Sequence, residues 1–281
     1  MQYIIRYMLD RNEAKMIYIN NEEKVKKIKF EKDNFYVVAD FDKTLTEGNS
    51  NSTWAVMANS NQLGEEYSTK RKALYEKYRP IEIDMTLSDE EKSNAITEWW
   101  KAHISLFKEY NLKENDIKKS ISDGGLRYRV GAKQFLKQMH ELNIPVIIIS
   151  AGIGNVIEEF LKYENDYYEN IKIVSNFIEF ENGNYKQIKG EVIHALNKNI
   201  VSLDEKSKEL LNGRENILLL GDGLPDLKMI SDNMIESAVT VGFLEEKIDE
   251  NLEYFNKGFD IVLTNQGTLD DVNKILNLYN F

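Results

Sequence analysis

The sequence predicts a doubly wound α/β fold, in which helices cover both faces of a mostly parallel sheet, with a helical domain inserted into it. Two observations lead to this prediction. Apolar runs of strand length alternate with amphipathic segments, and one long stretch that lacks strand signals interrupts them after the first run. A chain of 281 residues is long enough for one substantial core and a smaller second domain.

The strands and helices of the core follow from hydrophobic patterning. Buried parallel strands are nearly continuous apolar segments, and six such runs occur: 35–39, 144–149, 171–174, 217–220, 238–241 and 259–263. Amphipathic stretches between them predict helices at 132–142, 153–164, 191–199, 245–256 and 268–279. Asn182-Gly183, between alternating residues of the segment 175–190, predicts a β-hairpin.

The inserted domain is predicted from residues 46–128, which carry helix signals but no good strand. Residues 1–45 and 129–281 would then form the catalytic core. Ser88 and Glu91 have the spacing of a capping box at the start of a helix, and apolar residues recur beyond them at helical spacing. We call residues 46–128 the cap.

Composition excludes several classes of function. The chain has no cysteine, which rules out disulfides and cysteine metal sites and fits a reducing compartment. Its net charge is −11 and no basic run is free of acidic neighbours, so we expect no nucleic-acid partner. Charged residues interrupt the N-terminal apolar segments, and no stretch has the roughly 20 apolar residues of a membrane span. We therefore expect a soluble, cytoplasmic protein without a membrane partner. We also expect a monomer, although the composition does not bear on this.

Residues able to do chemistry stand at the ends of three predicted strands. The first strand ends in Asp40, the second in Ser150 followed by Ala151-Gly152, and the fourth in Gly221-Asp222. In open α/β sheets, ligands bind just beyond the carboxyl ends of the strands. These residues should therefore converge on one site although they are far apart in sequence.

The carboxylates in this set indicate a metal ion. Asp40 and Asp42 are two residues apart on an extended chain and point the same way, and Asp226 adds a further acid four residues after Asp222. Two like charges about 4 Å apart repel by roughly 4 kcal/mol at an effective dielectric near 20. Four carboxylates beside a phosphate need a hard cation that prefers oxygen ligands, and Mg²⁺ binds both carboxylate and phosphate oxygens. The predicted metal site comprises Asp40, Asp42, Asp222 and Asp226.

Two neighbouring aspartates can share the work of phosphoryl transfer. Asp40 can attack phosphorus to give an acyl phosphate. Asp42 can protonate the alkoxide that leaves and later deprotonate the attacking water.

The positive side of the site is predicted at the second strand. Ser150 and the backbone N–H groups of Ala151 and Gly152, at the start of a helix, form an anion site. A lysine should assist them, and the composition leaves both Lys189 and Lys198 open.

Taken together, the motifs resemble the haloacid dehalogenase superfamily: "DFDKTLT" as the form DxDxT, "IIISAG" as the strand-end serine and "GDGLPD" as the acidic pair. Longer segments resemble the cytosolic 5′-nucleotidase III (pyrimidine 5′-nucleotidase) family. They include "YEKYRPIEID", "SAGIGNVIEEFL", "KGEVIHALNKN" and "LLLGDGLPDLKM", and the resemblance runs from about residue 75 to 263. Lys43 departs from it, since it replaces an apolar residue inside the first motif.

The resemblance implies a Rossmann-like core with a helical cap after the first strand. It also implies Mg²⁺-dependent hydrolysis of nucleoside 5′-monophosphates, with pyrimidine or 7-methylguanosine bases. It favours Lys198 as the phosphate-holding lysine and implies Glu82 of the cap as a contact to the base, with Trp100 or His103 lining the base pocket. Mg²⁺ would be held by the carboxylates of Asp40 and Asp222 and the backbone carbonyl of Asp42, with Asp226 nearby.

Three alternatives stay open at this stage. The chain could be a phosphatase for another small phosphometabolite, or a nucleoside phosphotransferase that uses the same intermediate. It could also be a catalytically silent nucleotide-binding protein on the same fold.

Overall fold

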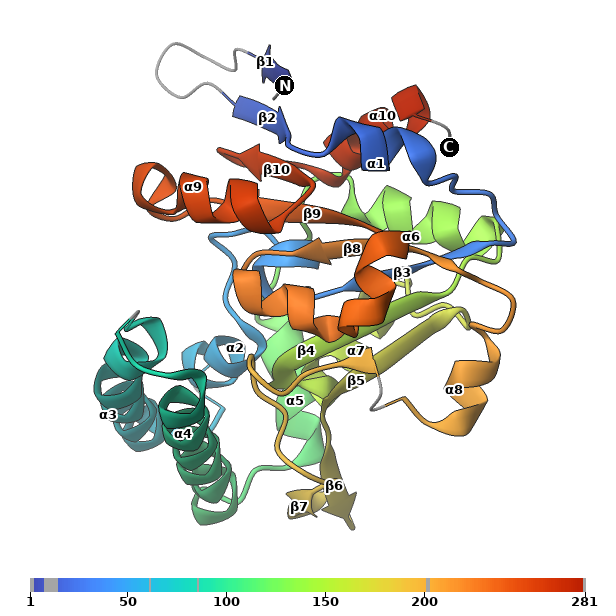
Figure 1. Cartoon of the computed structure of the whole chain (residues 1–281). Helices are drawn as coiled ribbons and strands as arrows, with labels where there is room; N and C mark the ends of the chain where they lie inside the picture. The colour runs from blue at the N-terminus through green and yellow to red at the C-terminus, as the bar shows by residue number, and fades with distance from the viewer. Residues whose placement is uncertain (1–2, 8–14, 61, 85, 201–202, 280–281) are drawn as a thin grey trace.

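The computed structural model describes residues 3–7, 15–60, 62–84, 86–200 and 203–279. Within them, an eight-stranded sheet has the order β1-β2-β10-β9-β8-β3-β4-β5 (Figure 1). The strands are β1 (Tyr3–Tyr7), β2 (Lys15–Ile19), β3 (Phe35–Ala39), β4 (Val146–Ile153), β5 (Ile171–Asn176), β8 (Asn216–Gly221), β9 (Ala238–Leu244) and β10 (Ile261–Thr264). All neighbours from β10 to β5 pair in parallel, whereas β1 and β2 form an antiparallel edge. Each of the six predicted strands is present.

Both faces of the sheet are buried, as the apolar runs predict. Along β3, Phe35, Val37 and Ala39 belong to one core cluster, and Tyr36 and Val38 belong to another. The first cluster includes α6 (Ala132–Glu141), α7 (Gly154–Tyr163) and α10 (Leu269–Tyr279), and the second includes α9 (Ile248–Gly258). Helices therefore cover both faces, and the doubly wound α/β class is confirmed.

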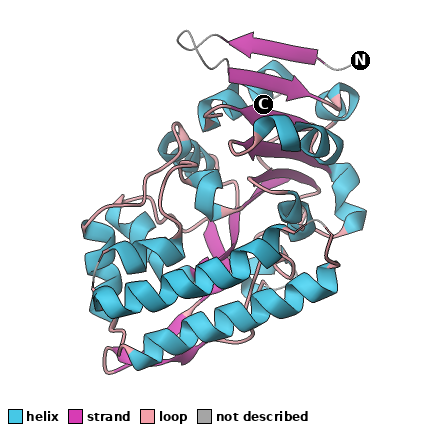
Figure 2. Ribbon diagram, turned by 90° about the vertical axis from the view of Figure 1, so that its left-hand side faces the viewer, coloured by secondary structure: helices cyan, strands magenta, loops and turns pink. Residues whose placement is uncertain are grey.

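The α-helices between β3 and α6 all lie inside the range predicted for the cap. They are α2 (Thr53–Asn59), α3 (Gly64–Ile83), α4 (Asp89–Glu109) and α5 (Glu114–Ser122). The two long ones, α3 and α4, pack side by side (Figure 2). The capping box is present, since Ser88 Oγ accepts from Glu91 N and Glu91 Oε2 accepts from Ser88 N. Assigning residues 46–128 to a separate domain stays a prediction.

The ends of the inserted segment meet where it leaves the core. Thr46 and Tyr128 form an antiparallel bridge, and Arg129 N donates to Leu45 O at 2.9 Å. The insertion therefore leaves and rejoins the core at one place.

The predicted hairpin is also present, as β6 (Ile178–Glu181) and β7 (Asn184–Ile188). Asn182 and Gly183 have φ of 52° and 76°, the positive values that a two-residue type I′ turn requires. The hairpin reaches the insertion, because Lys113 bridges Asn184.

The helix predicted at 191–199 is wrong, because this segment consists of turns and irregular backbone. Two asparagine side chains form hydrogen bonds with backbone groups that would otherwise pair within a helix. Asn176 accepts from Ile193 N at 2.8 Å and donates to Ile193 O at 2.8 Å, and Asn197 accepts from His194 N at 2.6 Å.

Three further features complete the described chain. Residues 1–30, which had no predicted role, include β1, β2 and α1 (Glu22–Lys27). The remaining helical segments are the π-helical turn η1 (Phe41–Leu45), α8 (Glu205–Glu209) and the 3₁₀ segments η3 (Leu224–Met229) and η4 (Asp232–Ser237). No helix in the described part of the chain is long and apolar enough to span a bilayer.

Candidate active site

The polar residues predicted at strand ends do meet at one edge of the sheet. The central strand β3 pairs with β4 on one side and with β8 on the other, all in parallel. Asp40 extends this pairing by one residue, because its N–H donates to Leu220 O at 3.0 Å. Ser150 differs from the prediction in one respect: β4 continues past it to Ile153, with a shift in register between Ile149 and Ile153.

Three of the four predicted acidic ligands form one cluster. Asp40, Asp222 and Asp226 each have a carboxylate oxygen within 4.8 Å of the others. Asp226 fixes the loop after β8, since its Oδ2 accepts from Asp222 N at 2.8 Å and Gly223 N at 2.9 Å. A Cβ at Gly221 would lie 2.5 Å from Asp226 Cβ, so this close approach requires glycine.

Lys198 is the lysine of this cluster. Its Nζ lies 2.5 Å from Asp40 Oδ1 and 2.8 Å from Asp226 Oδ1, and all three side chains are buried. Lys189, in contrast, is exposed just after β7. Although burial opposes its charge, the carboxylates of Asp226 and Asp40 raise the pKa of Lys198. The ammonium is therefore charged at neutral pH.

The charges of the cluster fit a divalent cation. Burial raises the pKa of Asp40 well above its usual value, although Lys198 opposes this shift. Burial and then the charge of Asp226 raise the pKa of Asp222 to about 7. Three carboxylates thus share one ammonium, and two of them resist ionisation. A small cation that prefers oxygen ligands, such as Mg²⁺, matches both the donor set and the excess negative charge.

Asp42 lies beside this cluster, and its carboxylate is held by Thr53 at the start of α2. Thr53 N donates to Asp42 Oδ1 at 2.9 Å, and Thr53 Oγ1 donates to Asp42 Oδ2 at 3.0 Å. Burial raises the pKa of Asp42 to about 6, and the two hydrogen bonds from Thr53 oppose this rise. A carboxyl group with this pKa can both give and take a proton near neutral pH.

The predicted anion-binding residues lie against Asp42. A Cβ on Gly152 would stand 3.2 Å from Asp42 Oδ2 and 3.1 Å from Ser150 Oγ. The Gly152 N–H, predicted as a phosphate donor, donates to Ser150 Oγ at 3.0 Å in this structure. The neighbouring carbonyl of Ala151 accepts from the indole N–H of Trp54 at 3.0 Å. We call Ser150–Ile153, the end of β4, the phosphate loop, because the sequence predicts phosphate contacts for its first three residues.

Sequence reasoning missed the residues that hold these loops in place. Asn176 Nδ2 donates to the carbonyls of Ala151 and Gly152 at 3.0 and 3.1 Å, and so ties the phosphate loop to the segment that carries Lys198. Arg129, only 3% exposed, donates from Nε to Thr44 O at 2.7 Å and also contacts Lys43 O. It thereby fixes the turn that follows Asp42.

The predicted contacts to a base lie apart from the acidic cluster. Glu82 forms an ion pair with Arg79 one turn earlier on α3. Trp100 and His103 both stack on Trp54, with ring centroids 4.7 and 4.6 Å away. Because Trp54 donates to the phosphate loop, it connects this aromatic cluster to the anion site.

Two polar atoms of the aromatic cluster lack partners. Trp100 Nε1 and His103 Nδ1 are buried and have no hydrogen-bond partner among the described residues. Burial, followed by the charge of Arg71, lowers the pKa of His103 to about 3, so its ring is neutral. Buried polar atoms without a partner require an explanation, and a ligand with polar edges would satisfy them.

Replacing Lys198 should show how strongly the acidic cluster destabilises the folded protein when its ion pairs are lost. In Lys198→Met, the buried carboxylates of Asp40 and Asp226 lose the ammonium with which both form ion pairs. We expect the free energy of unfolding to fall by about 3–5 kcal/mol without metal at neutral pH. Urea denaturation measures this, and Lys189→Met, at an exposed lysine, should change it by less than about 0.5 kcal/mol. Equal losses in both variants would contradict the assignment of Lys198 to the cluster.

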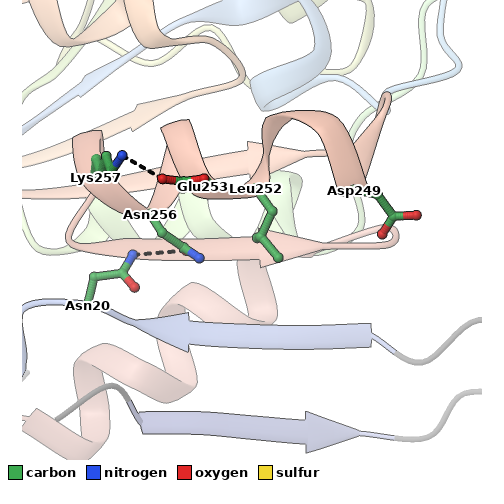
Figure 3. A pocket seen from close by; sticks show the side chains of 6 residues that line it. All are labelled: Asn20, Asp249, Leu252, Glu253, Asn256 and Lys257. Carbon is green, nitrogen blue, oxygen red and sulfur yellow. Dashed lines mark hydrogen bonds and ion pairs between the residues drawn. The ribbon is translucent and has the colours of Figure 1, made fainter.

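A surface hollow lies elsewhere on the molecule and contains none of the predicted site residues. It is found beside α9 and the end of β2 (Figure 3). Its lining residues are Asn20, Asp249, Leu252, Glu253, Asn256 and Lys257. Asn20 donates to Asn256 across it at 3.2 Å.

Comparison with known proteins gives consistent matches. A family model described as pyrimidine 5′-nucleotidase (UMPH-1) matches residues 39–279. The 7-methylguanosine phosphate-specific 5′-nucleotidase A of Xenopus laevis is 35% identical over 249 residues, covering 85% of this chain and 86% of that protein. The human 7-methylguanosine phosphate-specific 5′-nucleotidase is 35% identical over 253 residues, covering 87% and 84%. Among solved structures, cytosolic 5′-nucleotidase IIIB (cN-IIIB) bound to cytidine superposes with a TM-score of 0.75 at 28% identity, covering 92% of this chain and 89% of that one.

Proposed function

The chain belongs to the pyrimidine 5′-nucleotidase family, and from this premise we propose that it hydrolyses nucleoside 5′-monophosphates with Asp40 as the nucleophile. One observation carries the proposal. Lys198 pairs with Asp40 and Asp226, which form one acidic cluster with Asp222 at the edge of a parallel sheet where ligands bind.

The proposed reaction has two half-steps. In the first, an Asp40 oxygen attacks phosphorus, the bond from phosphorus to the ester oxygen breaks, and Asp42 gives its proton to that oxygen. In the second, Asp42 takes a proton from water, the water oxygen attacks the aspartyl-phosphate, and Asp40 is released as a carboxylate with free phosphate. Each group ends in the protonation state in which it began.

The remaining residues would orient the phosphate and offset its negative charge. Lys198 would hold the phosphate and Asp40 together, and the Ser150 hydroxyl with the backbone N–H groups of Ala151 and Gly152 would donate hydrogen bonds to the phosphate oxygens. Bound at Asp40, Asp222 and Asp226, with the backbone carbonyl of Asp42, Mg²⁺ would offset negative charge on the phosphate. The closeness of these acids and the raised pKa of Asp222 support this assignment.

For the substrate, we propose a pyrimidine or 7-methylguanosine nucleotide whose base lies against the cap. The named substrates of the relatives and the cytidine bound to cN-IIIB support this choice. The unpartnered Trp100 Nε1 and His103 Nδ1 could bond to the edge of a base. Glu82 would contact the base from α3.

The deciding experiment is phosphate release from a panel of esters with Mg²⁺ present. The panel contains CMP, UMP, 7-methyl-GMP, AMP, GMP and several sugar phosphates. We expect the highest kcat/KM on pyrimidine or 7-methylguanosine monophosphates. If a sugar phosphate is turned over fastest, the proposed nucleotide substrate is wrong, but the proposed attack by Asp40 still stands. Transfer of phosphate to an added nucleoside in preference to water would make the chain a phosphotransferase, and no release from any ester would make it a silent binder.

Glu82 allows a sharper test of base recognition. A carboxylate attracts the cationic base of 7-methyl-GMP more than the neutral base of CMP, so Glu82→Gln should raise the KM for 7-methyl-GMP on the order of tenfold and change that for CMP less. Glu76→Gln, an exposed glutamate on the same helix, serves as the matched control. If Glu82→Gln changes the KM for 7-methyl-GMP and for CMP by the same factor, Glu82 does not contact the base.

We also propose a cytoplasmic location and a monomeric state. The lack of cysteine and the name of the cytosolic relative support the first. Light scattering on the purified protein tests the second.

A further inference from the structure

Thr53 joins three parts of the site that are distant in sequence. It is completely buried at the first position of α2, the first α-helix of the cap. Its N–H and its hydroxyl each donate to a different oxygen of Asp42. The same hydroxyl oxygen accepts from Ile153 N at 3.1 Å, at the end of the phosphate loop.

The hydroxyl has no freedom to rotate away from Asp42. Its oxygen is fixed by the N–H of Ile153, and its only proton points to the carboxylate. A Cβ on Gly152 would lie 2.1 Å from this oxygen, which shows how closely the loop packs on it. The next residue, Trp54, donates its indole N–H to Ala151 O. The start of α2 is thus attached to the phosphate loop at two consecutive residues.

We propose that Thr53 is a positioning residue, which orients the Asp42 carboxyl group for proton transfer and makes that orientation depend on how α2 is seated against the phosphate loop. This inference rests on the proposed function, because that function gives Asp42 its proton-transfer role. Thr53 itself touches neither phosphorus nor the leaving oxygen. If α2 shifts relative to the phosphate loop, Asp42 loses both of its donors at once.

Replacing Thr53 with valine removes the hydroxyl and keeps the shape of the side chain. Asp42 then retains only the backbone N–H of residue 53, so its carboxyl group is no longer fixed at both oxygens. General acid–base catalysis typically contributes about 10²–10⁴-fold, and a misaligned Asp42 should lose part of this. We expect kcat for a nucleotide to fall on the order of tenfold to a hundredfold, with a smaller change in KM.

The substrate p-nitrophenyl phosphate distinguishes a misoriented Asp42 from a general disruption of the active site. Its leaving group departs as a stable anion and needs no proton, so the first half-step does not depend on Asp42. The second half-step, attack by water on Asp40-phosphate, still does. Stopped-flow measurement on Thr53→Val should therefore show a burst of about one equivalent of nitrophenolate, followed by slow turnover. With a nucleotide, both half-steps are slow and no burst of nucleoside should form.

Two variants serve as controls. Thr53→Ser keeps the hydroxyl and should restore wild-type behaviour. Ser52→Ala removes a hydroxyl one residue earlier, which caps α2 through Ala55 N but does not contact Asp42. It should lower the Tm by about 2–4 °C and leave the nitrophenolate kinetics unchanged.

The outcomes separate this inference from the function on which it rests. If Thr53→Val turns over nucleotide at the wild-type rate, loses rate equally on both esters without a burst, or behaves like Ser52→Ala, Thr53 is structural and the inference is wrong. If the wild type releases phosphate from neither ester, the proposed function itself fails.

Discussion

Asp40→Asn should bind nucleotide as the wild type does and release almost no phosphate. The amide cannot form the acyl phosphate on which both half-steps depend, and removing the nucleophile of such a site costs on the order of 10⁴-fold or more in kcat. The fold should survive, because Lys198 keeps its ion pair with Asp226. Phosphate release measures the loss, and calorimetric titration with CMP in the presence of Mg²⁺ measures the retained binding.

Two further variants make this prediction specific. Asp166→Asn changes an equally buried aspartate ahead of β5, at the opposite end of the strands, and should leave kcat unchanged. Asp42→Asn retains the nucleophile, so it should still release nitrophenolate from p-nitrophenyl phosphate and accumulate a phosphorylated protein that mass spectrometry detects. Substantial turnover by Asp40→Asn would show that another group attacks phosphorus.

Chelation of the metal should abolish turnover, and added Mg²⁺ should restore it. Without the cation, Asp40, Asp222 and Asp226 face a phosphate dianion, and the one ammonium of Lys198 that pairs with Asp40 and Asp226 does not balance this charge. Phosphate release before and after dialysis against a chelator measures the effect. Full activity after exhaustive chelation would contradict the metal site.

The same cluster predicts how the metal changes stability with pH. The pKa of Asp222 is raised to about 7 in the folded protein, above its value of about 3.9 in an unfolded chain. Between these values the folded state binds more protons than the unfolded state, so the stability of the metal-free protein falls as pH rises through this window. Bound Mg²⁺ keeps the carboxylates ionised and removes this dependence.

Thermal denaturation at several pH values measures the expected difference. The increase in Tm on adding Mg²⁺ should be larger near pH 8 than near pH 5, because protons compete with the metal at the lower pH. Asp222→Asn should lose most of this increase. An equal gain at both pH values would mean that the cation binds away from these acids.

The sequence was most informative where periodicity and topology constrain the chain together. Apolar runs predicted the six parallel strands, and the rule that ligands bind at their carboxyl ends predicted that Asp40, Ser150 and Asp222 lie at one edge of the sheet, as they do. The same patterning failed at 191–199, where Asn176 and Asn197 side chains compete with helical hydrogen bonds.

Residues that organise the site were invisible for a different reason. Thr53 and Ile153 form a hydrogen bond although they are 100 positions apart in sequence, and Arg129 and Thr44 do so across 85 positions. A buried threonine or arginine has no local signature, because its role depends on which backbone groups the finished fold places beside it. Resemblance to a family was needed to choose Lys198, since composition left Lys189 equally acceptable.

The bridge between Thr46 and Tyr128 has a consequence for how proteins of this design diversify. An insertion whose ends are adjacent can be lengthened, shortened or exchanged without rerouting any strand of the sheet. The edge of the sheet that carries Asp40 and the inserted segment that we propose contacts the base can then accumulate mutations largely independently. Thr53 limits that independence: an exchanged insertion must still present a donor to Asp42 at its first helical position.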